Sequence, residues 1–300
     1  MTVRSPLSGL DEIHSGAAAP RRGAGNCASN HDGAARDRQS IAAPRRSHAS
    51  PHPAERPAPV LRDVRAVVFD TDGVITDSAR VHAAAWKTAF DAFLRAHPPR
   101  DPALRRPFDV RDDYLRHVDG KSRLDGAAAF LRARGVDPSE ETVRAVAADK
   151  ERLFTERLRT HGVDAYPGTV RLVHALRRAG IPRAAASASR HAGELLDRAG
   201  VLDLFDVLVD GGEAARLGLP GKPRPDLFLE AVRRLGVPAA RAAVVEDALA
   251  GVEAGRRGGF ALVIGVDRTD GPYTAQRLLR HGADIVVSDL AELVVQGEPK

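Results

Sequence analysis

The chain of 300 residues is 43% apolar, which is enough to fill the core of one large domain or of a domain with a sizeable insertion. Its formal net charge is +5 at pH 7, but residues 1–60 supply +3 of this with eight arginines against five acidic residues, and the balanced remainder has no dense basic stripe, which argues against a nucleic-acid partner. No apolar run approaches the roughly eighteen residues of a membrane span, and the single cysteine, Cys27, cannot pair within the chain, so we expect a monomeric cytoplasmic enzyme without a membrane partner.

Residues 1–60 are predicted to form a disordered basic tail. The segment contains seven prolines and no Phe, Tyr or Trp, and it shows no sustained period. Such a sequence buries too little apolar surface to offset the entropy that is lost on ordering. A transit peptide is an alternative because the segment is rich in Arg and Ser, although its five acidic residues count against it. A start site further along the chain is another, and it would need a codon other than that of Met, since Met1 is the only methionine.

Beyond the tail, short apolar runs alternate with helical patterns. The predicted strands are Ala66–Phe69, Arg183–Ser187, Val207–Val209, Ala242–Val245, Ala261–Ile264 and Asp284–Val287. The helices between them include Gly168–Ala179, His191–Ala199 and Asp226–Leu235, and each of these three ends at a glycine suited to a left-handed C-cap. Strands that are apolar on both faces and alternate with helices predict an α/β fold with a doubly wound, Rossmann-like parallel sheet.

More than a hundred residues separate the first two strands, and most of them have helical patterns. These patterns are ARVHAAAWKTAFDAFL, LDGAAAFLRARG and SEETVRAVAADKERLFTERL. A structureless loop of this length is implausible inside a compact domain. We therefore predict that residues 79–164 form an all-helical cap domain inserted into a core of residues 61–78 and 165–300. The connections near 76–78 and 162–166 are expected to act as hinges.

Two aspartates, Asp70 and Asp72, follow the first predicted strand in the stretch VVFDTDGVITDS. In open α/β sheets the reacting groups lie at the carboxyl ends of the strands, and a spacing of two in extended backbone directs both side chains to the same side. Such a pair is costly unless a cation lies beside it, and magnesium prefers hard oxygen ligands of this kind. Gly73 then lets the chain turn away sharply.

Three other strand ends supply further polar groups. Ser187 and Ser189 lie at the start of a helix, where free backbone amides would form an anion site. Lys222 stands in a stiff loop between glycine and proline, and Glu246 and Asp247 form a second carboxylate pair. Four acidic groups, a lysine, hydroxyls and a helix N-terminus together indicate a magnesium-assisted phosphoryl-transfer site. Taken alone, the second carboxylate pair is also typical of a helix N-terminus.

The ordered motifs DTDGVITDS, SAS, GKPRPD and VVEDA resemble the haloacid dehalogenase superfamily, and the insertion point resembles that of its members with a helical cap. More narrowly, DGVITDSARVHAAAWK and VDGKSRLDG resemble the β-phosphoglucomutase group. The resemblance covers about residues 61–293. The sequence departs from the family pattern at Thr71, where Leu is frequent, at Ala248, where some relatives have Ser, and at Asp119, where some mutases have a basic residue.

The resemblance implies roles for the core residues. Asp70 would be the nucleophile that becomes an aspartyl phosphate, and Asp72 would be the general acid and base. Ser187 and Lys222 would hold the oxygens of the transferring phosphoryl group. The implied Mg²⁺ ligands are the Asp70 carboxylate, the backbone carbonyl of Asp72, and Asp247, with Glu246 alongside.

The cap motif DGKSRLDG suits a clamp for a second phosphate, because Arg123 could grip it with its planar guanidinium. The expected substrate-binding set is His82, Trp86, Gly120, Lys121, Ser122 and Arg123, with Ser189 and Arg190 facing it from the core. Each of these has a structural alternative: Arg123 could form a salt bridge on a helix face, and His82 and Trp86 could belong to the cap core. Lys150 is expected to be a solvated residue of a cap helix.

These residues favour a magnesium-dependent phosphotransferase that interconverts β-glucose 1-phosphate and glucose 6-phosphate through an aspartyl phosphate and a sugar bisphosphate. The close alternative is a sugar-phosphate phosphatase, which would use the same core motifs with water as the acceptor. A third hypothesis is a non-catalytic scaffold that contacts an acidic partner through the basic tail. The intact pair Asp70 and Asp72, together with Lys222, argues against the scaffold.

Overall fold

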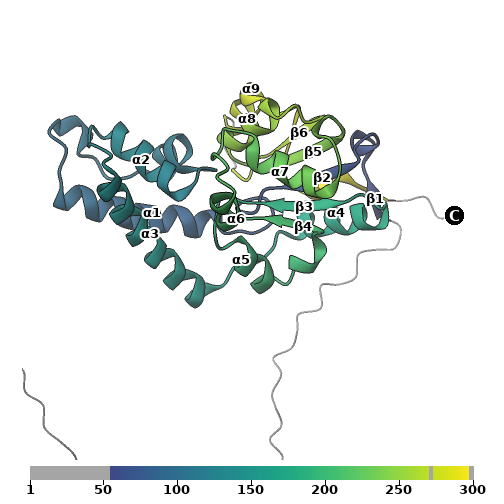
Figure 1. Ribbon diagram of the computed structural model, residues 1–300, viewed down its shortest axis with the longest axis horizontal. Helices are drawn as coiled ribbons and strands as arrows, with labels where there is room; N and C mark the ends of the chain where they lie inside the picture. The colour runs from purple at the N-terminus through teal and green to yellow at the C-terminus, as the bar shows by residue number, and fades with distance from the viewer. Residues whose placement is uncertain (1–54, 270–272, 297–300) are drawn as a thin grey trace, which may run out of the picture. The chain divides into compact units, whose positions relative to one another are not determined.

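The computed structural model describes residues 55–269 and 273–296, all of which belong to a compact unit of residues 49–300 (Figure 1). Cys27 and most of the predicted tail lie outside the described residues. Among the described residues, no helix is both long and apolar enough to cross a membrane.

A six-stranded, all-parallel sheet forms the centre of the core, with the strand order β4-β3-β2-β5-β6-β7. Its strands are β2 (Ala66–Phe69), β3 (Arg183–Ala186), β4 (Val207–Val209), β5 (Ala242–Glu246), β6 (Leu262–Val266) and β7 (Ile285–Val287). All six predicted strands are present, and the predicted doubly wound α/β fold is confirmed. β2 lies between β3 and β5, so the carboxyl ends of these three strands meet at one edge.

Helices cover both faces of this sheet (Figure 1). They are α4 (Pro167–Arg178), α5 (Ala192–Arg198), α6 (Gly211–Arg216), α7 (Asp226–Leu235), α8 (Leu249–Arg257) and α9 (Thr274–His281). Successive side chains of β2 enter different apolar clusters, because neighbouring residues of a strand point to opposite faces. Phe69 packs in a cluster with Leu172 of α4, while Val68 packs in a cluster with Phe228 of α7.

A second, two-stranded sheet pairs β1 (Glu55–Pro57) with β8 (Val294–Gln296) in the antiparallel direction. The Glu55 carboxylate is buried, and Arg171 donates to it at 2.7 Å. Arg178 donates to the Glu55 carbonyl oxygen at 2.9 Å. The predicted tail is therefore wrong for residues 55–60, because pairing with a strand 240 residues away leaves no sign in local composition.

The helical insertion consists of α1 (Ala79–Ala96), α2 (Arg123–Ala133) and α3 (Glu140–His161), with a π-helical turn at Tyr114–Val118. Short 3-10 helices lie at Pro59–Leu61, Pro102–Leu104, Leu202–Leu204, Ala239–Arg241 and Leu290–Leu293. The apolar centre of this cap contains Phe90 and Phe130, whose ring centroids are 4.0 Å apart. The cap thus has a hydrophobic core of its own, separate from the two clusters around the sheet.

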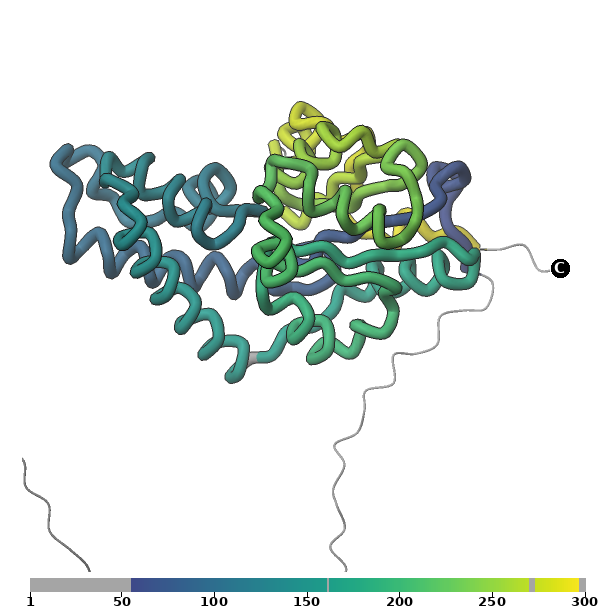
Figure 2. Tube along the Cα trace, in the orientation of Figure 1, coloured from purple at the N-terminus to yellow at the C-terminus, as the bar shows by residue number. Residues whose placement is uncertain are grey.

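The chain enters and leaves the cap through two adjacent connections (Figure 2). The Asp77 N–H donates to the Asp164 carbonyl at 3.0 Å, and Thr76 forms an antiparallel bridge with Ala165. These positions lie in the predicted hinge segments. The contacts show that the two segments are adjacent, and their role as hinges stays a prediction.

Candidate active site

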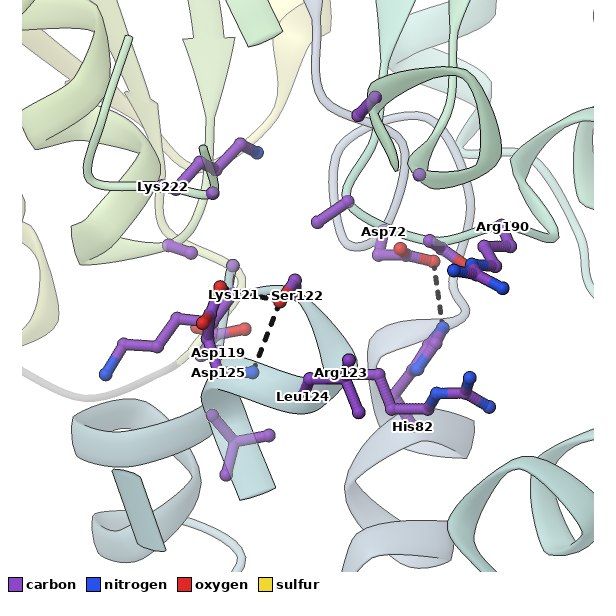
Figure 3. Close-up of a pocket in the computed structure, with 18 of the residues that line it drawn as sticks. Asp72, His82, Asp119, Lys121, Ser122, Arg123, Leu124, Asp125, Arg190 and Lys222 are labelled. Carbon is purple, nitrogen blue, oxygen red and sulfur yellow. Dashed lines mark hydrogen bonds and ion pairs between the residues drawn. The ribbon is translucent and has the colours of Figure 1, made fainter. Parts of the chain in front are cut away.

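A cavity of about 420 Å³ lies between the cap and the edge of the sheet where β2, β3 and β5 end. Figure 3 shows part of its lining, including Asp72 and Lys222 from the core and Arg123 from the cap. Of the predicted site residues, all but Ser187 and Glu246 line this cavity, and those two are buried directly behind it. The sequence prediction therefore identified a set of residues that folding brings together.

Asp70 is held at the end of β2 by contacts on both carboxylate oxygens. Its Oδ1 accepts a short hydrogen bond from Lys222 Nζ, and its Oδ2 accepts from the Asp72 N–H at 3.0 Å. Burial raises the pKa of Asp70 well above its ordinary value, although Lys222 opposes this shift. The carboxylate is thus oriented and weakly solvated, which suits a nucleophile.

Lys222 is the cation of this buried group. Its ammonium also donates to Glu246 Oε1 at 2.6 Å, and the side chain is only 1% exposed. Burial by itself would lower the pKa of Lys222, but the carboxylates of Asp70 and Glu246 outweigh it and raise the pKa above its ordinary value. Lys222 is therefore protonated at neutral pH.

The carboxylates of Asp70, Glu246 and Asp247 form the candidate metal site, since one oxygen of each lies within 4.8 Å of the others. Burial, and then repulsion from neighbouring carboxylates, raises the pKa of Asp247 well above its ordinary value. Glycine at position 73 makes room for this arrangement, because a Cβ at Gly73 would lie 1.8 Å from Asp247 Oδ2. Two buried carboxylates and one half-buried carboxylate stand beside one lysine, so the donor set fits a hard divalent cation such as Mg²⁺.

Asp72 points away from this cluster toward the cap. Its Oδ1 accepts a short hydrogen bond from the Ser78 hydroxyl and lies 3.3 Å from His82 Nε2, while its Oδ2 accepts from Ser187 Oγ at 3.4 Å (Figure 3). Burial would raise the pKa of Asp72, but His82 and then Ser78 outweigh burial and hold the pKa well below its ordinary value. Asp72 is therefore ionised at neutral pH and can accept a proton.

Lys150 continues this chain of contacts from α3. Its Nζ lies 2.9 Å from His82 Nδ1, and burial lowers its pKa to about 8. Burial and then Lys150 lower the pKa of His82, so the imidazole is neutral, with Nδ1 as acceptor and the proton on Nε2 facing Asp72. The prediction that Lys150 is a solvated helix residue is wrong: the residue is 3% exposed, and its ammonium lies over the rings of Phe154 and Trp86, 4.4 Å and 5.7 Å from their centroids.

The loop after β3 differs from the prediction of free amides at Ser187 and Ser189. The Ser187 N–H donates to the Val209 carbonyl at 3.0 Å, since it continues the pairing with β4. The Ser189 N–H donates to Ser187 Oγ at 3.1 Å. Both amides are thus already bonded. The Ser187 hydroxyl donates to Asp72, and Ser189 Oγ accepts from the His191 N–H at 3.2 Å, so a phosphoryl oxygen would take the Ser187 proton in place of Asp72 or accept the Ser189 proton.

In the cap, the motif DGKSRLDG has structural as well as cavity-lining roles. Ser122 caps α2, because its Oγ accepts from the Asp125 N–H at 3.2 Å. Lys121 Nζ donates to the Arg116 carbonyl at 3.4 Å. Arg123 Nη1 forms an ion pair with Glu151 Oε2 at 2.9 Å, so this residue does take part in a salt bridge, and its role as a phosphate clamp stays a prediction. Gly120 has a φ of 69° and packs against the core, where a Cβ would lie 2.8 Å from the Cβ of Ala248.

His82 and Trp86 pack against aromatic residues of the cap and also line the cavity, so their role in substrate binding stays a prediction. His82 stacks on Phe154 with centroids 4.1 Å apart, and Trp86 stacks on Phe90 at 4.7 Å, yet both line the cavity. Arg190 is exposed where the core meets the cavity.

Sequence reasoning missed or underrated several cavity groups. Glu151 and His191 line the cavity and pair with each other at 2.5 Å across the two domains. Asp119 is half-buried, and desolvation followed by repulsion from Glu246 raises its pKa to about 7. Tyr114 lies beside it in the π-helical turn. The π-helical geometry is common at functional sites, but it leaves no signal in the sequence.

Comparison with known proteins gives the class of this chain. The family model described as haloacid dehalogenase-like hydrolase matches residues 64–259, and the chain belongs to this family. More narrowly, the chain is 42% identical over 240 residues to the β-phosphoglucomutase of Mycobacterium bovis, a match that covers 77% of this chain and 92% of that protein. Both parts of the predicted resemblance are thereby confirmed.

Two solved structures extend the comparison. The β-phosphoglucomutase of Clostridium difficile has a TM-score of 0.59 and 25% identity, over 77% of this chain and 93% of that one. A CbbY variant from Rhodobacter sphaeroides, in complex with xylulose-(1,5)bisphosphate, has a TM-score of 0.58 and 26% identity, over 77% of this chain and 96% of that one. The chain is thus an enzyme-family member whose structural relatives include a protein crystallised with a sugar bisphosphate.

Proposed function

We propose that the protein is a magnesium-dependent phosphotransferase that interconverts β-glucose 1-phosphate and glucose 6-phosphate. The observation that carries this proposal is the placement of Asp70, Asp72 and Lys222 opposite the cap residue Arg123 in one cavity. The 42% identity to a β-phosphoglucomutase supports the choice of substrate. We also propose a cytoplasmic location and a monomer as the working state.

Transfer begins at the Asp70 carboxylate. One of its oxygens forms a bond to phosphorus while the bond from phosphorus to the sugar oxygen breaks, so that the phosphoryl group moves to the enzyme. Lys222 and the Ser187 hydroxyl lie beside this carboxylate and its neighbour Asp72, where they would stabilise the phosphoryl oxygens. Bound Mg²⁺, held by Asp70 and Asp247 with Glu246 alongside, would offset the negative charge that gathers there.

Asp72 moves the proton. In the free protein it is ionised, so it can accept the proton of the sugar hydroxyl that attacks the phosphorylated Asp70. When the phosphoryl group moves from the sugar bisphosphate to Asp70, Asp72 still carries the proton that it accepted from the sugar hydroxyl, and it returns this proton to the sugar oxygen as the bond to phosphorus breaks. Ser78 and His82 would favour the ionised form and so keep Asp72 ready for the attack of the hydroxyl.

A mutase must hold a second phosphate while the first is exchanged. Arg123 supplies a planar guanidinium on the cap side of the cavity, and the exposed Arg190 supplies another on the core side. Release of the sugar bisphosphate and its return in the opposite orientation would complete the cycle.

The alternative is a sugar-phosphate phosphatase. The same four core motifs would serve it, with water in place of the sugar hydroxyl, and the matching family model is described as a hydrolase. The two functions differ in the fate of the phosphoryl group, so product analysis separates them.

The test is a phosphorus NMR time course with β-glucose 1-phosphate, Mg²⁺ and a trace of glucose 1,6-bisphosphate. The wild type, Asp70→Asn and the exposed control Asp137→Asn are compared. Conversion to glucose 6-phosphate by the wild type and the control, but not by Asp70→Asn, is the expected result. Accumulation of inorganic phosphate in step with substrate loss would replace the mutase with the phosphatase.

A further inference from the structure

Glu151, in the middle of α3, contacts two basic side chains from different parts of the fold. Its Oε2 lies 2.9 Å from Arg123 Nη1, at the start of α2, and its Oε1 lies 2.5 Å from His191 Nε2, at the start of α5. α2 and α3 belong to the cap, whereas α5 belongs to the core. One carboxylate therefore joins the expected phosphate clamp to the core.

Each partner is positioned for this role. Arg123 and Glu151 are both 28% exposed at the cavity, so their attraction is partly shielded from water. A guanidinium has five N–H donors, and a carboxylate on Nη1 leaves others for a phosphate. His191 directly follows the loop of Ser187, Ser189 and Arg190. Its contact with Glu151 therefore restrains the backbone next to the residues that are expected to bind the phosphoryl group.

Apolar contacts between α3 of the cap and α5 of the core lie beside the Glu151–His191 pair. Leu195 of α5 packs in one cluster with Phe154 and Leu158 of α3, and the His191 ring lies 5.5 Å from the Phe154 ring. These contacts bring α5 against α3, and the Glu151 carboxylate is the charged member at the cavity end of the same surface. Other titratable groups near it are Glu194, 3.5 Å from His191 Nδ1, and Lys150, the neighbour of Glu151 on α3.

We propose that Glu151 is a positioning residue for the phosphorylated sugar: it fixes Arg123 at the cavity and docks the cap on the core through His191. The inference rests on the proposed function, because it assumes that Arg123 receives the distal phosphate. It adds a residue that acts through two others and touches no reacting atom. In this arrangement the position of Arg123 and the docking of the cap on the core depend on the same carboxylate.

The inference has a pH dependence with a defined sign. Hydrogen bonding to Glu151, with a further contribution from Glu194, raises the pKa of His191 above its ordinary value of 6.5. A proton on His191 is therefore favoured by the docked cap, and the docking contact weakens as the pH rises from about 6.5 through the raised pKa of His191. Glu151 itself stays ionised, since His191 and Arg123 outweigh burial and hold its pKa at about 2.

The experiment compares five full-length variants with the wild type: Glu151→Gln, Glu151→Asp, His191→Gln, the double variant of Glu151→Gln with His191→Gln, and the control Glu156→Gln. Glu156 is an exposed residue of the same helix and undergoes the same change of charge. The pKa of His191 is measured by NMR of its imidazole, and kcat and KM are measured with β-glucose 1-phosphate. Binding of glucose 6-phosphate and of inorganic phosphate is followed by the fluorescence of Trp86, the single tryptophan, which lines the cavity.

In Glu151→Gln we expect the pKa of His191 to fall toward 6.5, and KM and the dissociation constant of glucose 6-phosphate to rise about tenfold, with kcat and phosphate binding changed far less. Glu151→Asp should recover part of the loss. Glu151→Gln and His191→Gln should be non-additive when combined, because they remove one contact. Glu156→Gln should match the wild type throughout.

The outcomes distinguish this inference from the proposed function. Normal turnover in Glu151→Gln, with KM and the pKa of His191 as in Glu156→Gln, would overturn the inference and leave the function standing. No turnover of glucose phosphates by wild type and control alike would overturn the function and the clamp role of Glu151. The docking role through His191 would then stand or fall with the NMR titration alone.

Discussion

Glu246 Oε1 accepts a hydrogen bond of 2.6 Å from Lys222 Nζ, deep behind the cavity, where both side chains are at most 1% exposed. The same ammonium binds Asp70, so a single positive charge serves two buried carboxylates. The positive charge of Lys222 therefore offsets only part of the negative charge of the carboxylates in the candidate active site.

Replacement of Lys222 by methionine should remove the positive charge that offsets the carboxylates of Asp70 and Glu246. With two carboxylates left buried without a cation, we expect a loss of about 3–5 kcal/mol in the free energy of unfolding and a drop of about 10²–10³ in kcat. Urea unfolding and turnover with Mg²⁺ measure the two effects. Lys87→Met, which changes a lysine that is 44% exposed in the cap, is the control and should have little effect on kcat. Near-normal turnover in Lys222→Met would remove Lys222 from the catalytic machinery.

Magnesium should stabilise the fold more at higher pH. Burial raises the folded-state pKa of Asp70 and Asp247 above the ordinary value of 3.8, so their contribution to stability is present at low pH and is lost as the pH rises through the raised pKa values. A divalent cation binds the ionised carboxylates and offsets this loss. We expect the rise in Tm on adding MgCl₂ to be larger at pH 8 than at pH 5, as measured by calorimetry. An equal rise at both pH values would contradict a metal site made of these groups.

Gly73→Ala should remove the response to magnesium. Gly73 has a φ of 84°, and an added Cβ would lie 1.8 Å from Asp247 Oδ2, so this carboxylate would have to move. Gly180→Ala is a matched control, because Gly180 has a φ of 68° but no atom within 4 Å of an added Cβ. Both variants should lose about 1–2 kcal/mol of stability from backbone strain. Only Gly73→Ala should also lose turnover and the magnesium-dependent rise in Tm; loss of both in Gly180→Ala would show that backbone strain is sufficient.

Residues 1–54 are expected to be dispensable, in contrast to Glu55. Deletion up to residue 54 should leave turnover and the free energy of unfolding within about 0.5 kcal/mol of the wild type. Glu55→Ala should cost about 1–2 kcal/mol, because it removes the carboxylate that accepts from Arg171, while the exposed guanidinium groups of Arg171 and Arg178 stay hydrated. Loss of turnover on deletion of residues 1–54 alone would revive a functional role for the tail, including the scaffold hypothesis.

The parts of the fold that follow a short local pattern could be predicted from the sequence. β2 and β5 are apolar runs bounded by polar residues, and the motifs at their ends place Asp70, Asp72 and Asp247 at one edge of the sheet. Parallel strands leave few other positions for such residues. The correct part of the site prediction therefore depended on the sheet and on the family resemblance.

The rest depended on contacts between distant segments. Lys150 is a charged residue at an ordinary helix position, and only the packing of α3 against α1 reveals that it is buried beside His82. Ser189 has a bonded amide because of a turn that its sequence does not specify. The composition around Glu55 predicts a polar tail, whereas the residue pairs with Gln296 of β8. In each case the decisive partner lies in tertiary structure, where composition and periodicity carry no information.

The hydrogen bond between Asp77 and Asp164, together with the bridge between Thr76 and Ala165, makes the two connections to the cap the stem of a hairpin. The cap is thus an insertion at the end of this stem, between β2 and β3, and it contributes no strand to the six-stranded sheet. In the proposed function, Arg123 would hold the distal phosphate and Asp70 would form the bond to phosphorus, and these two residues lie in modules joined by this stem. In the proposed function, replacing the cap at this stem by the cap of another family member would change the sugar phosphate that is bound and leave the phosphoryl-transfer residues of the core unchanged.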